Sequence, residues 1–69
     1  MKFTVLELQN GVVGSNCWTY DTLQEAEAKY HATLATAATS AVRIHAAVII
    51  NEAGFLVRSQ AYNHPEVET

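Results

Sequence analysis

Apolar and polar residues alternate with a period of two in one stretch of the chain, Val42–Ala46. That stretch lies in one of three segments that resemble strands: Lys2–Leu8, Ala41–Ile50 and Phe55–Tyr62. They are rich in β-branched and aromatic residues, which favour strands. A fourth, shorter segment of this kind, Cys17–Tyr20, follows a turn that the Asn-Gly step predicts over Gln9–Asn16. We therefore expect four strands, paired as a first and a last hairpin.

The middle of the chain repeats its apolar residues every three or four positions, which predicts one helix from Thr22 to about Thr39. Asp21 or Thr22 can cap this helix, because Gln24 and Glu25 lie three residues after them. The predicted apolar stripe comprises Leu23, Ala26, Tyr30, Leu34 and Ala37 or Ala38.

The order β-β-α-β-β predicts an α+β domain over residues 1–62, with residues 63–69 as a loose tail. A right-handed crossover gives a four-stranded antiparallel sheet of order 2-1-3-4, with the helix on one face. Pairing Ile50 with Phe55 gathers the larger aliphatic residues on one side, which we expect to be the core. That side comprises Val42, Ile44, Ala46, Val48, Ile50, Phe55, Val57, Ser59 and Ala61. The uncovered side then pairs Ile49 with Leu56, Ala47 with Arg58, His45 with Gln60 and Arg43 with Tyr62.

The predicted uncovered side mixes apolar with charged residues, whereas a sheet face in contact with water is usually mostly polar. A chain of 69 residues has a small core, and its one cysteine, Cys17, excludes an intrachain disulfide. We therefore expect a homo-oligomer that meets through its sheet face or its helix. The helix offers small residues off its apolar stripe for such a contact: Ala32, Ala35, Thr36 and Thr39.

Composition argues against several classes of function. The net charge of −3, with four Lys and Arg residues, is unlike that of a general nucleic-acid binder. No apolar run is long enough to span a membrane, and the first residues do not resemble a signal peptide, so we expect a cytoplasmic protein. Cys17 and the three histidines lack the spacing of catalytic or metal-binding motifs. We therefore predict no catalytic residue, no metal and no cofactor.

One group of residues is compatible with an anionic, flat-ringed ligand. Arg43 and His45 share the predicted open face, where Arg58 and Tyr62 join them from the last strand. An arginine can bind a phosphate through two hydrogen bonds, and an aromatic ring can stack on a base. Further candidates for this site are Trp18, Tyr20, Tyr30, Lys29 and His31. The alternative is that these are solvated residues beside an oligomer contact.

Nearly the whole chain resembles short uncharacterised proteins of phages and prophages of gut Firmicutes. The resemblance rests on MKFTVLELQ, WTYDTLQEAEAKYH, HAAVII and GFLVRS, together with the run of small residues. Some small phage proteins oligomerise and sequester nucleotide immune signals, such as the cyclic ADP-ribose isomers of Thoeris or the cyclic dinucleotides of CBASS. By analogy, the resemblance implies a non-enzymatic, oligomeric anti-defence protein in the host cytoplasm. The alternative is a protein–protein interaction module, either an inhibitor of a host enzyme or a structural adaptor.

Overall fold

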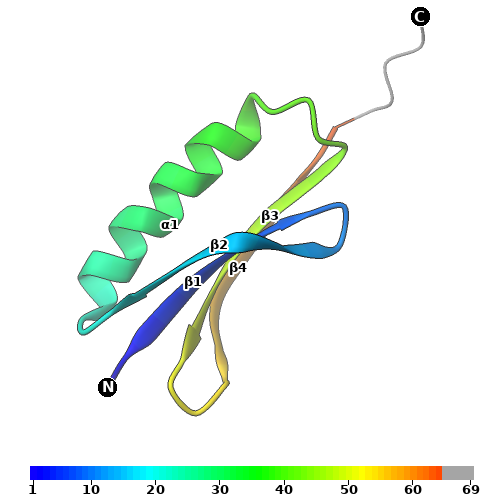
Figure 1. Cartoon of the computed structure of the whole chain (residues 1–69). Helices are drawn as coiled ribbons and strands as arrows, with labels where there is room; N and C mark the ends of the chain where they lie inside the picture. The colour runs from blue at the N-terminus through cyan, green and yellow to red at the C-terminus, as the bar shows by residue number, and fades with distance from the viewer. Residues whose placement is uncertain (65–69) are drawn as a thin grey trace, which may run out of the picture.

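The protein is an α+β domain in which one helix lies on one face of an antiparallel sheet (Figure 1). The computed structural model describes residues 1–64, apart from the side chain of Ser15. The four strands are ordered β2-β1-β3-β4, so the predicted fold class and strand order are confirmed. The elements are β1 (Phe3–Gln9), β2 (Val12–Tyr20), α1 (Leu23–Ala38), β3 (Ile44–Asn51) and β4 (Leu56–Asn63).

The first hairpin turns tightly at Asn10 and Gly11, whose φ angles are 54° and 82°. Both residues therefore adopt the left-handed backbone conformation, which is the one that an Asn-Gly turn uses to connect two twisted strands. The turn predicted over Gln9–Asn16 is too long, because β2 already begins at Val12. The extra length of β2 gives β1 a partner along almost its whole length.

Helix α1 begins as the sequence predicts and buries the predicted stripe. Thr22 is the N-cap, and its hydroxyl oxygen accepts a hydrogen bond from the Glu25 amide at 3.2 Å. Its last helical residue is Ala38, and Thr39 is the C-cap. The buried residues of the helix are Ala26, Tyr30, Thr33, Leu34 and Ala37.

The small residues on the outer side of α1 are exposed in this chain. Two of the threonines are satisfied locally, because the Thr36 hydroxyl donates to the Ala32 carbonyl (3.3 Å) and the Thr39 hydroxyl to the Thr36 carbonyl (3.4 Å). These bonds give the threonines a role within the helix itself. A contact with another subunit through Ala32, Ala35, Thr36 and Thr39 stays a prediction.

The helix covers the face of the sheet that we predicted to be open. His45, Ala47 and Ile49 of β3 are at most 2% exposed and lie on the helix side. Alternate residues of a strand point to opposite faces. The predicted assignment is therefore wrong for the whole of β3, and its other residues lie on the uncovered side: Ile44, Ala46, Val48 and Ile50.

Close packing explains why α1 lies on this face of the sheet. Ala26 and Ala37 of α1 and Ala47 of β3 are all fully buried, and side chains this small let the helix approach the sheet closely. Larger side chains pack around this centre, including Phe3, Trp18, Tyr20 and Tyr62. Counting aliphatic residues selects the wrong face because this core is built largely from small and aromatic residues.

The turn between β3 and β4 is longer than predicted and includes Phe55. The Asn51 side-chain oxygen accepts a hydrogen bond from the Phe55 amide at 3.0 Å. Ile50 therefore pairs with Leu56, and a bulge at Val57 shifts the remaining pairs by one more residue. The predicted register is wrong, and the observed pairs are Ile49 with Arg58, Ala47 with Gln60 and His45 with Tyr62.

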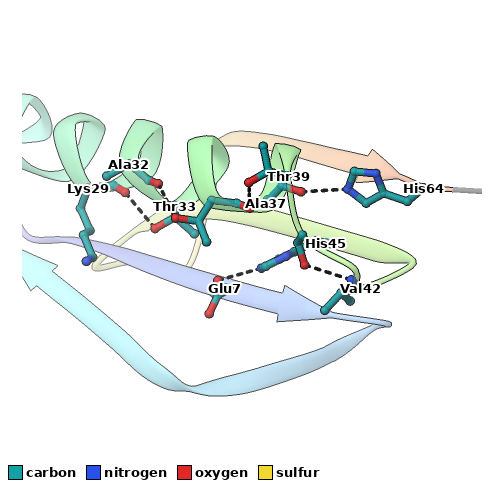
Figure 2. A network of polar contacts seen from close by, with 11 residues as sticks. Glu7, Lys29, Ala32, Thr33, Ala37, Thr39, Val42, His45 and His64 are labelled. Carbon is teal, nitrogen blue, oxygen red and sulfur yellow. Dashed lines mark hydrogen bonds and ion pairs between the residues drawn. The ribbon is translucent and has the colours of Figure 1, made fainter.

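The chain stays attached to the sheet beyond the predicted domain end at residue 62. β4 continues to Asn63, and the His64 amide donates to the Arg43 carbonyl at 2.6 Å. The His64 ring also donates from Nε2 to the Ala37 carbonyl at 2.8 Å, which satisfies the carboxyl end of α1 (Figure 2). The remainder of the predicted tail, residues 65–69, lies outside the described residues.

Two neighbouring isoleucines test the assignment of the faces. Ile49→Ala is expected to lower the free energy of unfolding by about 3 kcal/mol, because it leaves a cavity under the helix. Ile50→Ala removes a partly exposed side chain and is expected to cost about 1 kcal/mol. Denaturant unfolding measures both values, at a protein concentration where the midpoint no longer depends on concentration. A larger loss for Ile50→Ala would contradict the observed orientation of β3.

Candidate interaction surface

The nine residues predicted to bind a nucleotide do not come together. Trp18 and Tyr20 lie on β2, whereas Arg58 and Tyr62 lie on β4, the opposite edge of the sheet. β1 and β3 separate these edges, so the two groups are three strand spacings apart, about 14 Å. Helix α1 carries Lys29 and His31, and it buries Tyr30 against the sheet.

Several of these residues are also occupied by contacts within the chain. Tyr30 is 4% exposed, and His31 packs edge-on against its ring at 5.4 Å between centroids. Lys29 Nζ lies 4.0 Å from the centroid of the Trp18 ring, close enough for a cation–π interaction. The Tyr20 ring packs against the hydrophobic core.

The residues on the side of β4 are engaged as well. Arg58 Nε is 3.4 Å from Glu27 Oε1, and the Tyr62 ring stacks on His64. Arg43 is exposed but precedes β3, so it does not pair with Tyr62 as predicted. No shared pocket for phosphate and base follows from this arrangement.

His45 forms a buried pair with Glu7 that the sequence analysis missed. His45 Nε2 and Glu7 Oε2 are 2.7 Å apart, and the two side chains are 3% and 16% exposed. Figure 2 shows the pair beneath α1, with Glu7 reaching from β1 toward His45. The signal for it was a carboxylate inside an apolar strand, facing the same side as a histidine on the neighbouring strand.

The histidine of the Glu7–His45 pair is shielded from solvent. A general acid or base must reach the substrate proton, directly or through one water. His45 Nδ1 is buried and has no hydrogen-bond partner in the described part of the chain, and Nε2 already contacts Glu7. Within residues 1–64, His45 therefore has one ring nitrogen paired with Glu7 and one buried without a partner.

A concavity of about 310 Å³ lies beside Glu7 at the β1–β2 hairpin. It is lined by Glu7, Gln9, Val12, Gly14 and Asn16. The lining therefore contains one carboxylate and two side-chain amides but no cationic residue. A phosphate is bound most strongly by cationic donors, and the Glu7 carboxylate would repel it. This concavity is therefore a poor match for an anionic ligand.

The side of the sheet away from α1 is an uncharged, largely apolar surface, here named the open face. No helix or strand of residues 1–64 covers it (Figure 1). Among charged residues, only Glu7 and Arg58 lie within strands, and both are on the helix side. By strand alternation and register, the open face comprises Thr4, Leu6, Leu8, Val13, Cys17, Thr19, Ile44, Ala46, Val48, Ile50, Leu56, Ser59, Ala61 and Asn63.

The open face has an apolar centre and a partly polar margin. Leu6 pairs with Val48 across the central strands β1 and β3. Toward the edge strand β2, the hydroxyls of Thr4 and Thr19 are 3.0 Å apart, and Ser59 is exposed on the other edge. A centre of aliphatic side chains within a more polar rim is the usual anatomy of a protein–protein interface.

The chain matches no protein-family model, no curated protein and no solved structure. Across residues 1–64, no helix has both the length and the apolar character required to cross a membrane. In the same part of the chain, no three His, Cys, Asp or Glu side chains gather in a way that suits a metal ion. The chemistry of the open face is therefore the strongest guide to function.

The Glu7–His45 pair makes a stability prediction. Glu7→Ala is expected to lower the free energy of unfolding by about 2 kcal/mol, because it leaves the buried His45 ring without its hydrogen bond. Glu7→Gln keeps a polar partner and is expected to cost less. Glu27→Ala, which removes a more exposed partner of Arg58, is the control and should cost under about 1 kcal/mol. Equal effects of Glu7→Ala and Glu27→Ala in thermal unfolding would show that the buried pair contributes nothing special.

Proposed function

We propose that this chain is a non-catalytic protein–protein interaction module and that the open face is its binding surface. The observation that supports this is the chemistry of an uncovered sheet face that carries no charged residue. In a sheet with one face in water, that face is usually polar. Here the charged strand residues lie on the helix side instead, which is the reverse of the usual arrangement.

The size of the open face supports the same proposal. Strands lie about 4.8 Å apart and rise about 3.4 Å per residue, so four strands of seven residues present roughly 450 Å². Apolar patches of several hundred Å² on soluble proteins usually mark a contact with another molecule. Three side chains on this face are strongly exposed: Val13 (55%), Ile44 (41%) and Leu56 (61%).

Site-specific photo-crosslinking tests the proposal with a matched pair of positions. Ala61 lies on the open face and Ala35 on the outer side of α1, and both are exposed alanines. A photoreactive residue at position 61 is expected to form a covalent protein adduct in the cells that express the chain, and one at position 35 is not. Adducts from position 35 alone, or from neither position, would contradict the proposal.

The nucleotide-binding function expected from the sequence stays a prediction, as does the phage origin. Its proposed residues are split between two sheet edges, and His45 and Tyr30 are buried. We therefore expect titration calorimetry with cyclic ADP-ribose isomers and cyclic dinucleotides to show no heat of binding. Saturable binding that is lost in Arg58→Ala, with folding retained, would restore that function and weaken the present proposal.

A further inference from the structure

We propose that the partner of the open face is a second copy of this chain, packed face to face in a two-fold symmetric dimer. The inference rests on the proposed function and names its partner. In such a contact, each copy contributes the same patch to the interface. The dimer would consist of four layers, with the two sheets inside and the two helices outside.

The distribution of charge favours a copy of the same chain. Each copy carries a net charge of −3, so two copies repel each other through most approaches. The open face contributes none of this charge, because its side chains are aliphatic, hydroxyl, thiol or amide groups. Two copies that meet there bury no like-charge pair. A strongly charged partner would find no opposite charge on this surface.

The arrangement of side chains also suits contact with an identical surface. The two-fold axis would lie in the plane midway between the two sheets, over the centre of the open face. This symmetry places the central strands β1 and β3 over the central strands of the other copy. Leu6 and Leu8 of β1 and Val48 and Ile50 of β3 then fill the space between sheets that pack about 10 Å apart. Ser59 of the edge strand β4 pairs with Val48 and lies beside this centre.

The area available is sufficient for a small dimer. Each copy presents roughly 450 Å² of flat surface, and its protruding side chains add to this area. The two copies together would bury about 1,000 Å² or more, which is in the lower range for specific interfaces. A dimer would also enlarge the small hydrophobic core of the chain. Ile49 and Val5 are its largest fully buried side chains, and proteins shorter than about 80 residues often depend on oligomerisation for stability.

Sedimentation equilibrium of the purified full chain tests the dimer with substitutions on the two sides of the molecule. The wild-type chain is expected to form a reversible dimer of twice 7.6 kDa. Val48→Lys places a charge in the centre of the contact of both copies, which should raise the dimer dissociation constant at least about 100-fold. Ala35→Lys adds the same charge to the outer side of α1 and should leave the constant unchanged.

A second pair of variants guards against loss of folding. Ser59→Arg changes an exposed residue on the open face and is expected to weaken the dimer while circular dichroism stays that of the wild-type chain. Val48→Thr keeps the β-branched shape and should weaken the dimer less than Val48→Lys does. A dimer that survives both Val48→Lys and Ser59→Arg, in folded protein, would overturn the proposed contact.

The outcomes separate this inference from the proposed function. A wild-type chain that is monomeric at every concentration overturns the dimer. If position 61 then still crosslinks to a different protein, the open face remains an interaction surface and only the identity of its partner is wrong. A dimer that is disrupted by Ala35→Lys but unaffected by Val48→Lys would place the contact on the helix and contradict both.

Discussion

A single helix can cover only one face of a sheet, and in this protein both faces of the sheet are largely apolar. The helix side is closed by Val5, Ala47 and Ile49 together with residues of α1. The other side presents Leu6, Val48 and their neighbours with no element of residues 1–64 above them. The choice of the covered face therefore determines both the composition of the core and the chemistry of the surface that remains.

That choice follows from the size of side chains rather than from their hydrophobicity. Three buried alanines allow α1 to lie close to the sheet, and aromatic rings fill the space at its sides. The same packing brings Glu7 and His45 within hydrogen-bonding distance under the helix. The charged strand residues thus lie on the helix side, and the opposite side of the sheet carries none.

Local chemistry made much of the fold predictable. The Asn-Gly turn, the Thr22 cap and the three- and four-residue repeat of α1 are encoded by neighbouring residues, so the elements and strand order followed from the sequence. The orientation of β3 did not, because both of its alternating sets are apolar enough to be buried. The register of β4 failed as well, since a longer turn at Phe55 and a bulge at Val57 leave no clear mark in the sequence. The candidate ligand site depended on the orientation of β3, because α1 covers the face that carries His45. The strand order itself separates Trp18 and Tyr20 from Arg58 and Tyr62.

Access of solvent to the open face is the most direct measure of this account. A water-soluble paramagnetic reagent broadens the NMR signals of methyl groups that it can approach. In the wild-type chain at high concentration, the methyl signals of Leu6, Ile44 and Val48 are predicted to stay sharp while that of the exposed Ala35 broadens. Upon dilution, the signal of Ile44, which is 41% exposed in the single chain, is predicted to become sensitive to the reagent. Broadening of Ile44 to the same extent as Ala35 at every concentration would contradict the claim that another protein surface covers this face.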